Sequence, residues 1–451
     1  MGKFDIVVVG AGTGGSTAAR KAAEKGYNVG LIDQKPKNKI GEKVCGEAVG
    51  KHHFDHLQIA PPQGEELASL VRGIDIYSPD QKTLFRIEGE GLHGYMVNRH
   101  ELGQRLLNEA LDQGVELIAN TTVLSPLVEN DFIYGIKTKN RLRNEVENHY
   151  GKVIIDASGM SAVLRKQTPA EWGFERNILN EDVEICYQEI RELSNTSEPD
   201  YLGIYLDQTV APGGYYWIFP KGENVVNVGL GIQMKTSFPN PKTQLYDHIL
   251  KTPLFKNSKK ITGKGGLLAT RRPINSLVGN GILVIGDAAC QPNPIHGGGI
   301  GPSMIAGHLS AELAYEAIET GDVSRLGMWR YNQEYMASYG AKAAGLDVFR
   351  LFLQKCSNSD LNYGMRNRLI QEEDILRASL GEDLRLNITD KAQRFFRGIK
   401  RLSFLRALQI TADKMKQIKQ LYTQFPQPKD HSHWIATVDA LIDDMKRTVT
   451  L

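Results

Sequence analysis

Three glycines near the start of the chain have a spacing that suits the binding of a dinucleotide. Gly10, Gly12 and Gly15 follow the apolar run at residues 6–9 and lead into an alanine-rich segment. Glycines placed in this way allow a tight turn and a close approach of the backbone to a pyrophosphate, and the following helix offers N–H groups and the positive end of its dipole. A second apolar run ends at Asp33, whose carboxylate can accept hydrogen bonds from a ribose. We therefore predict a dinucleotide site on these residues.

A second glycine cluster indicates which dinucleotide is bound. Residues 282–285 have the apolar character of a strand, and they are followed by Gly286, Asp287 and a glycine-rich run that leads into a helix. An acid at the end of a parallel strand can hold the ribityl hydroxyls of a flavin, and a glycine-rich helix start can approach the flavin ring. These features predict FAD. Asp156, at the end of another strand-like run, and Arg99, at the start of a helical segment, are expected in the same site.

The run "PGGYYWIFP" at residues 212–220 carries three rings on alternate positions. Because successive residues of a strand point to opposite faces, Tyr215, Trp217 and Phe219 would form one continuous aromatic wall. Such a wall either packs into an ordinary hydrophobic core or lines a pocket, and the run alone leaves both open.

Together these motifs resemble a known family. The first glycine motif, the segment from Asp156 to Arg165 and the pair Gly286-Asp287 occur in this order in FAD-dependent enzymes similar to p-hydroxybenzoate hydroxylase. Within that class, residues 212–220 match every fixed position of the PxxYxWxFP signature of the geranylgeranyl reductases, and "KVCGEAV" at 43–49 and "PIHGGGIG" at 294–301 also resemble that family. Asp33 stands where many flavoproteins carry Glu, but both side chains accept the ribose hydrogen bonds.

The resemblance implies a reaction. It is closest to archaeal enzymes that saturate isolated double bonds in the geranylgeranyl chains of ether-type membrane lipids, by hydride transfer from reduced FAD together with protonation. It also implies that Tyr215, Trp217 and Phe219 bind the prenyl substrate. The residues that it assigns to the cofactor are Gly10, Gly12, Gly15, Asp33, Cys45, Gly46, Arg99, Val123, Asp156, Gly286, Asp287, Gly298, Gly299 and Ile300.

Two side chains are predicted to supply the proton. Cys45 follows the second strand in a glycine-containing loop that reaches the flavin in this fold, and His296 precedes the glycine cluster on the other side. Cys45 is the first candidate and His296 the second, while water on the flavin is a third source. His52, His53 and His56 lack an accompanying pattern of acids or cysteines, so we expect a solvated helix face and no metal site there.

These elements predict an α/β chain, α+β overall, with a discontinuous Rossmann-like FAD domain of the p-hydroxybenzoate hydroxylase type. We place the FAD domain at residues 1–60, 94–165 and 265–330. The inserted segments 61–93 and 166–264 are expected to form a substrate-binding sheet over the flavin. Residues 331–451 are expected to be mainly helical.

Composition narrows the partners. The net charge of +2 over 451 residues argues against a nucleic-acid partner, and the four scattered cysteines suit a reducing cytoplasm and show no CxxC pairing. The sequence has no second GxGxxG with its own strand and acid, so an external donor, NAD(P)H or a ferredoxin-like carrier, is expected to reduce the flavin. No apolar run suits a membrane span, but residues 391–420 hold nine Lys or Arg and one acid, which predicts peripheral contact with the inner face of the membrane.

Three other functions fit part of this pattern. The same fold supports FAD-dependent monooxygenases that act on aromatic rings. A prenyl-lipid cyclase or isomerase could use reduced flavin without net redox change. A lipid carrier without catalytic activity would also need an apolar pocket, but it would not need the Cys45 loop and the glycine cluster to meet at a flavin.

Overall fold

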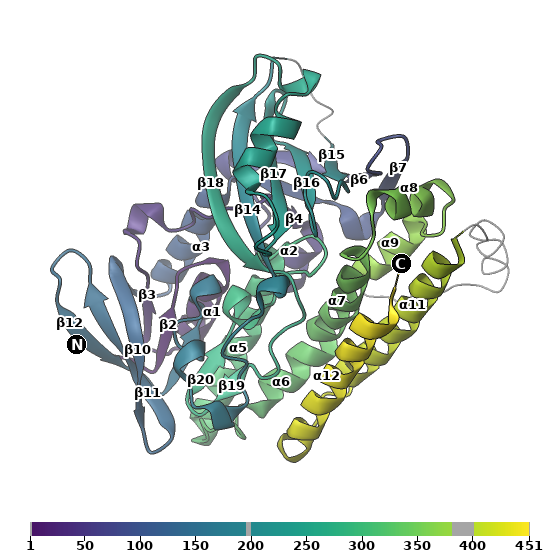
Figure 1. The fold of residues 1–451 in the computed structure, drawn as a ribbon. Coiled ribbons are helices and arrows are strands. Elements are labelled where there is room, and N and C mark those ends of the chain that lie inside the picture. Colours follow the sequence, from purple (N-terminus) through teal and green to yellow (C-terminus); the bar gives the residue numbers. More distant parts are fainter. Residues whose placement is uncertain (1, 195–199, 381–400, 451) are drawn as a thin grey trace.

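The computed structural model describes residues 2–194, 200–380 and 401–450 (Figure 1). A parallel sheet with helices forms one part of the molecule, a large antiparallel sheet stands above it, and the C-terminal helices pack along one side (Figure 1). The predicted mixed α/β architecture is confirmed.

The six-stranded sheet carries the first glycine motif. Its strand order is β19-β20-β13-β2-β3-β9, and all neighbouring strands are parallel except β19 and β20. The strand β2 is buried over its whole length, as expected for a strand covered on both faces. Because the carboxyl ends of β2, β3 and β20 meet at one edge, the sheet brings Gly10, Asp33 and Gly286 together. The strands are β2 (Ile6–Val9), β3 (Val29–Ile32), β9 (Glu116–Ile118), β13 (Val153–Asp156), β19 (Val278–Gly279) and β20 (Ile282–Val284).

Two helices start at this edge and cross closely. They are α1 (Thr13–Glu24) and α5 (Ile300–Thr320), and α3 (Arg99–Asp112) packs against α1 as well. A Cβ atom at Gly307 would lie 2.3 Å from the carbonyl oxygen of Gly14, so glycine at this position is what allows α5 to approach α1. The close crossing places the N-terminus of α5 beside the N-terminus of α1, at the mouth of the glycine turn.

The seven-stranded sheet combines strands from two separate stretches of the chain. Its order is β18-β14-β17-β16-β15-β6-β7, and its neighbours are antiparallel except β6 and β15. The strands come from 73–88 and 183–269, which lie within the two predicted insertions except that β18 runs past residue 264. The strands are β6 (Gly73–Tyr77), β7 (Leu84–Glu88), β14 (Val183–Glu192), β15 (Tyr201–Tyr205), β16 (Tyr215–Pro220), β17 (Val225–Gln233) and β18 (Lys259–Ala269).

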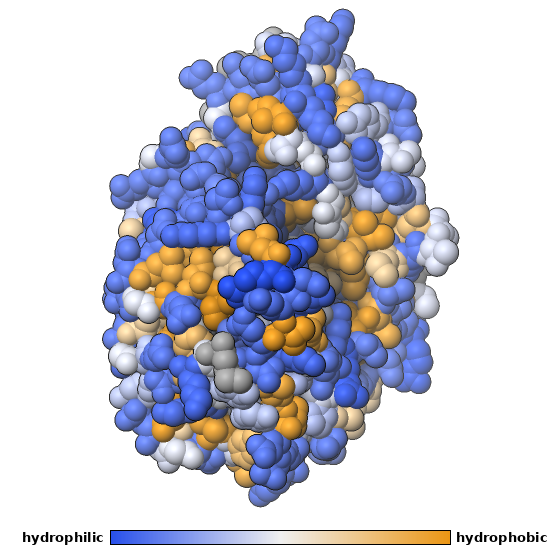
Figure 2. All heavy atoms as spheres, turned by 90° about the vertical axis from the view of Figure 1, so that its left-hand side faces the viewer, coloured by the Kyte–Doolittle hydropathy of each residue, from blue (hydrophilic) through white to orange (hydrophobic). Residues whose placement is uncertain are grey.

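Two smaller sheets complete the strands. One is four-stranded, in the order β1-β12-β11-β10, and lies on the side of the molecule that faces the viewer in Figure 2, where hydrophobic patches interrupt a largely hydrophilic surface. The other, β4-β8-β5, joins a strand from the 61–93 insertion to strands on both sides of it. The strands are β1 (Gly2–Lys3), β4 (Ala48–Gly50), β5 (Leu67–Val71), β8 (Gly94–Val97), β10 (Thr121–Glu129), β11 (Phe132–Asn140) and β12 (Val146–Tyr150).

The C-terminal region is helical where it is described, and α7, α11 and α12 run side by side (Figure 1). A buried ion pair ties it to the large sheet: Arg350 of α7 contacts Asp182, which precedes β14, at 2.7 Å, and it also contacts Asp347 of its own helix at 2.7 Å. The remaining helices are α2 (Lys51–Leu57), α4 (Pro241–Gln244), α6 (Trp329–Tyr335), α7 (Ala341–Leu353), α8 (Asn358–Arg366), α9 (Glu372–Leu380), α11 (Leu402–Thr423) and α12 (His431–Thr448), with π-helical segments at Leu245–Ile249 and Met336–Gly340.

Candidate functional site

A cavity of about 730 Å³ lies where the parallel sheet's carboxyl edge meets the large antiparallel sheet. Its walls include the glycine turn after β2, the loop that contains Cys45, the loop from Asp287 to the start of α5, and the inner face of β14, β16 and β17. The structure therefore brings together, in one cavity, segments that are as far apart in the chain as Val9 and Lys342.

The three glycines of the first motif serve three different purposes. Gly10 has φ +102°, and a Cβ there would lie 2.4 Å from the carbonyl oxygen of Ala157. A Cβ at Gly15 would lie 1.8 Å from the carbonyl oxygen of Gly10, so the helix can follow the turn this tightly only with glycine. No described atom lies within 4 Å of a Cβ built at Gly12. That open space above the N-terminus of α1 suits a pyrophosphate.

Asp33 holds the turn and lines the cavity. Its carboxylate accepts hydrogen bonds from the backbone N–H groups of Ala11 and Lys35, both at 2.8 Å. These bonds place the carboxylate at the end of β3, beside the turn that follows β2. This is the position at which an acid can bind the hydroxyls of a ribose.

The buried side chain of Arg99 is a reason to expect a ligand in the cavity. The side chain is 5% exposed at the start of α3 and lines the cavity, and its Nε and Nη1 have no hydrogen-bond partner among the described residues. Burial lowers the pKa of the guanidinium, but arginine remains charged at neutral pH. A buried charged group without partners is costly unless a ligand supplies acceptors. A phosphorylated dinucleotide fits this requirement.

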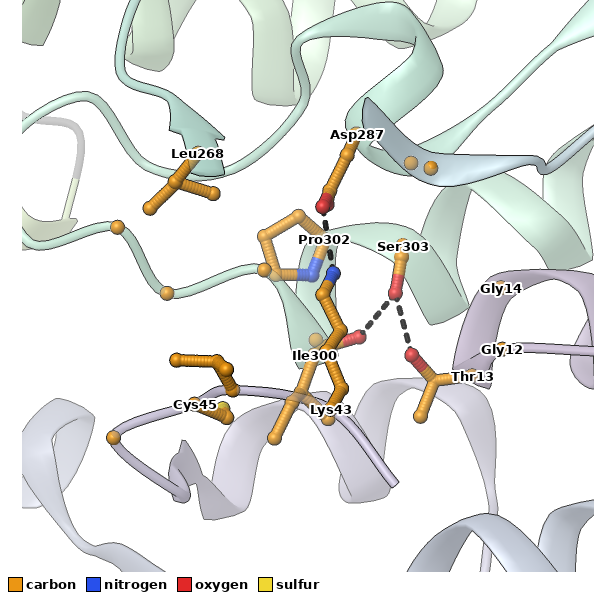
Figure 3. A pocket seen from close by; sticks show the side chains of 18 of the residues that line it. Gly12, Thr13, Gly14, Lys43, Cys45, Leu268, Asp287, Ile300, Pro302 and Ser303 are labelled. Atoms are coloured by element: carbon orange, nitrogen blue, oxygen red, sulfur yellow. Dashed lines mark hydrogen bonds and ion pairs between the residues drawn. The ribbon is translucent and has the colours of Figure 1, made fainter. Parts of the chain in front are cut away.

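Asp287 lines the cavity next to the loop that carries Cys45. Its carboxylate forms an ion pair with Lys43, with Nζ 2.6 Å from Oδ2 (Figure 3). Next to it, the hydroxyls of Ser303 in α5 and Thr13 in α1 lie 2.8 Å apart, which ties the two helix starts together (Figure 3). Lys43 is 49% exposed, so it is free to move when a ligand competes for the Asp287 carboxylate.

Val123 and Asp156 are both predicted to contact the cofactor, but only one of them lines the cavity. Val123 lines the cavity. Asp156 does not: its carboxylate accepts hydrogen bonds from the backbone of Ser158, Leu164 and Arg165, at 3.0–3.2 Å. Asp156 therefore shapes the loop whose residues 157–161 do line the cavity, and the structure gives it a supporting position in place of the predicted contact. The other predicted cofactor residues all line the cavity.

Cys45 reaches the cavity on a loop held by the large sheet. Its backbone N–H donates to Gln188 of β14 at 3.3 Å, and its Sγ accepts from the backbone N–H of Glu47 at 3.2 Å. Burial raises the pKa of the thiol, so it stays protonated at neutral pH. Gly46 leaves room for the wall, because a Cβ there would lie 3.0 Å from the ring of Phe219.

The aromatic wall exists and lines the cavity. The ring centroids of Tyr215 and Trp217 lie 6.0 Å apart, and those of Trp217 and Phe219 lie 6.1 Å apart. Trp217 and Phe219 also belong to a small hydrophobic cluster with Val71, Met96 and Leu202. Tyr216 points to the opposite face of the sheet, where it stacks on Tyr205 at 4.5 Å. The wall is thus both a packed layer and a cavity surface.

The histidines of the region differ from the predictions made for them. The side chain of His296 is accessible from the cavity, which it lines. The protein that surrounds the cavity removes bulk water from the imidazole, and this desolvation and the charge of Lys342 lower the pKa of His296 to about 4. Its imidazole is therefore neutral at pH 7 and poorly suited to donate a proton as an acid. The predicted solvated face is wrong for His53. Its side chain is only 7% exposed and packs against Gly301. The described residues contain no group of three His, Cys, Asp or Glu arranged to hold a metal.

Several residues of the cavity were missed from the sequence. Glu184 and Cys186 line it from β14, and Asn227 of β17 supports a lining residue, because it accepts a hydrogen bond from Trp217 Nε1 at 2.9 Å. The sequence did contain a signal for these residues. Gly229 and Gly231 are two positions apart on β17, the strand that follows the wall, and glycines on one face of a strand leave room for large side chains of the neighbouring strands. A Cβ at Gly229 would lie 2.5 Å from Trp217, and one at Gly231 would lie 2.3 Å from Glu184.

Comparison with known proteins gives consistent matches. The family model described as the geranylgeranyl reductase catalytic domain matches residues 182–268, and that of the FAD dependent oxidoreductases matches residues 5–221. The chain is 42% identical to the digeranylgeranylglycerophospholipid reductase of Sulfolobus acidocaldarius, over 99% of each chain. It is 31% identical to the enzyme of that name from Methanothrix thermoacetophila, over 86% of this chain and 96% of the relative.

A solved structure shares the fold. It is a geranylgeranyl bacteriochlorophyll reductase-like protein from Thermoplasma acidophilum, 26% identical, with a TM-score of 0.76 over 91% of this chain and 100% of that chain.

Replacing Asp287 by Ala is expected to weaken retention of FAD. The change removes the carboxylate that closes one side of the cavity and leaves Lys43 without its partner. The loss of charge-assisted hydrogen bonds of this kind costs about 1.5–3 kcal/mol, or roughly 10- to 150-fold in affinity. Flavin absorbance and fluorescence during dialysis measure the loss. Asp5→Ala, which removes the surface pair with Lys152, is the control and should retain FAD; equal retention by both variants would contradict the assignment.

Proposed function

The chain belongs to the digeranylgeranylglycerophospholipid reductase family, and we propose that the cavity between the parallel sheet's edge and the aromatic wall is where it saturates geranylgeranyl chains. It is an FAD-dependent oxidoreductase, as the sequence motifs predicted. The enzyme reduces geranylgeranyl chains of archaeal-type lipids.

One observation supports this location of the reaction above the others. Gly12, Asp287 and Gly299 of the cofactor motifs line the same cavity as Tyr215 and Trp217 of the wall. An alkene held against the wall would therefore share a continuous space with the bound cofactor. When it is bound and reduced, FAD supplies the hydride for this chemistry.

The apolar walls match what the substrate requires. Taking a prenyl chain out of water is favourable by about 0.8 kcal/mol per CH₂ group, but the chain of a membrane lipid starts in an environment as apolar as the cavity. Transfer from a bilayer is therefore close to neutral at best, and a polar wall would make it unfavourable. Trp217, Phe219, Leu202, Ile204 and Val71 provide an apolar surface of this kind.

The aromatic rings have a second role in this proposal. An isolated alkene accepts hydride poorly, because no carbonyl stabilises the negative charge, so protonation must accompany the transfer and positive charge develops on the more substituted carbon. The faces of Tyr215 and Trp217 stabilise such charge by cation–π interaction, worth about 0.5–2 kcal/mol.

The electron donor of this proposal comes from outside the chain. The sequence carries one GxGxxG motif with its own strand and acid, and that motif is part of the FAD site. NAD(P)H or a ferredoxin-like carrier would therefore have to reach the flavin by diffusion.

Peripheral contact with the membrane is also part of the proposal, because the lipid must leave a bilayer. None of the helices in the described parts of the chain combines the length and hydrophobicity needed to cross one. The basic stretch predicted to contact the surface is described only from residue 401, and residues 391–400 lie outside the described residues. In α11, Phe404 and Leu408 are buried and Lys414 pairs with Asp444 at 2.6 Å. The described part therefore packs its apolar side chains on the body, and the proposal places the contact on the cations of residues 391–400.

Pre-reduced protein is expected to saturate geranylgeranyl ether lipids. Mass spectrometry of the lipid after incubation with dithionite-reduced protein should show about two mass units gained per double bond, because each saturation adds two hydrogen atoms. No mass change would support a cyclase, an isomerase or a carrier. Oxygen consumption driven by NADPH and phenols would support a monooxygenase instead.

Trp217→Ala is expected to change the number of double bonds saturated while FAD remains bound. The substitution opens the wall at its centre and removes the hydrogen bond to Asn227, while the glycine motifs and Asp287 assigned to the cofactor stay in place. Trp217→Phe separates the apolar ring from the hydrogen bond, since Phe keeps an aromatic surface but cannot donate to Asn227. Tyr216→Leu on the opposite face of the same strand is the control. An unchanged product distribution in Trp217→Ala would mean that the wall is ordinary core.

Flotation with liposomes tests the membrane contact. We expect binding to anionic vesicles that weakens as salt rises, because each exposed cation near such a surface contributes about 1 kcal/mol and is screened within a Debye length. Replacing Arg394, Arg397 and Lys400 together by Gln should reduce binding, whereas Lys416→Gln, on the exposed side of α11, serves as the control. Binding that ignores lipid charge and salt would contradict the proposal.

A further inference from the structure

One buried acid that lines the cavity has not been assigned to the cofactor or to the prenyl substrate. Glu184 on β14 is 8% exposed and lines the cavity. The acids that flank it in the chain are paired: Asp182 contacts Arg350, and Glu189 contacts Arg191 and Lys260. Among the described residues, Glu184 forms no ion pair of this kind. Burying a carboxyl among apolar and aromatic side chains is costly, so its presence on this wall requires a reason.

Two glycines make room for the Glu184 carboxyl beside the aromatic wall. A Cβ atom at Gly231 would lie 2.3 Å from Oε2 of Glu184, and one at Gly214 would lie 3.3 Å from it. Gly231 pairs with Tyr215 in the sheet, and Gly214 precedes Tyr215 in the chain. The carboxyl therefore leans across β17 toward Tyr215, where the wall begins.

Tyr215 connects this position to the cofactor loop. Its hydroxyl donates a hydrogen bond to the carbonyl oxygen of His296 at 2.8 Å, two residues before Gly298. On the same inner face of β14, Gln188 accepts from the backbone of Cys45. Glu184 thus lies between the two loops assigned to the cofactor, on the wall assigned to the substrate.

Building on the proposed function, we propose that the Glu184 carboxyl donates the proton that completes saturation of the double bond, in place of His296 and ahead of Cys45. The hydride and its electron pair come from the reduced cofactor, which is oxidised. The O–H bond of Glu184 breaks, its proton forms the second new C–H bond, and the carboxylate that remains takes a proton from water before the next double bond.

The electrostatic surroundings support this role. Burial raises the pKa of Glu184 to about 7, which is close to the value that favours a general acid at neutral pH. The titratable and charged groups that face it are Cys186 on its own strand, Tyr215 on β16 and Arg350 on α7. Arg350 lowers this pKa, but its guanidinium is already bound to Asp182 and Asp347. By contrast, His296 is neutral at this pH and has no imidazolium proton to give, and burial makes the Cys45 thiol a weaker acid than an ordinary thiol.

Variants of Glu184 test the proposal, with the rate of double-bond saturation measured on pre-reduced enzyme and geranylgeranyl lipid. Glu184→Gln should bind FAD normally and slow saturation on the order of 100-fold, the contribution typical of a general acid. Glu184→Asp should recover part of the rate. Glu192→Gln, at the exposed end of the same strand, is the matched control. In the wild type the rate should fall as pH rises through about 7, because the acid form is lost, and this step should be absent from Glu184→Gln.

A second measurement needs no turnover. Infrared difference spectra of protein labelled with ¹³C-glutamate should show one protonated carboxyl band that disappears as pH rises through about 7 and is missing from Glu184→Gln. Absence of that band, or an undiminished rate in Glu184→Gln together with a large loss in Cys45→Ala, would overturn the proposal. If the wild type fails to saturate the lipid while the band is present, the proposed function fails and the titration of Glu184 stands.

Discussion

The buried carboxylate of Glu47 is the point on which the site depends. Its Oε2 accepts from Lys221 Nζ at 2.7 Å and from Asn227 Nδ2 at 3.0 Å, while Oε1 accepts from the backbone N–H of Arg99 at 3.2 Å. One side chain thus joins the Cys45 loop, the start of α3 and the end of the wall strand. Glu47 has φ +65°, which is unfavourable for a residue with a Cβ and persists because these bonds hold it.

This network also sets the relation between the cofactor loop and the wall. Asn227 accepts a hydrogen bond from Trp217 and donates one to the carbonyl oxygen of Cys45 at 2.9 Å, so the indole ring and the cysteine loop share one amide.

The two sides of the cavity differ in chemistry because they come from different kinds of sheet. The parallel sheet ends in backbone amides and acids that suit phosphates and hydroxyls, and the antiparallel sheet presents one continuous apolar face.

Local patterns were sufficient for the parts of the site that lie on single elements. The positions of Gly10, Gly12, Gly15, Asp33 and Asp287 follow from strand ends and helix starts, and the structure places all of them on the cavity. Patterns failed where a side chain has two chemically sensible uses. Asp156 ends a strand as Asp33 does, yet backbone amides of the next loop occupy its oxygens. His53, on a helix that looked solvated, is covered by α5.

The sequence by itself determined the family, the cofactor and the rings of the wall, because each depends on residues close together in the chain: a turn, a strand end, an alternating run. Only the tertiary structure decided what those residues face. Glu184 is one acid among 52 Asp and Glu in the chain. What distinguishes it is the space over Gly231 and the absence of a nearby free cation within the described residues. Burial and partnership arise from the packing of segments distant in sequence, and they decide whether a carboxyl is a surface charge, a structural anchor like Glu47 or an acid held ready to give up its proton.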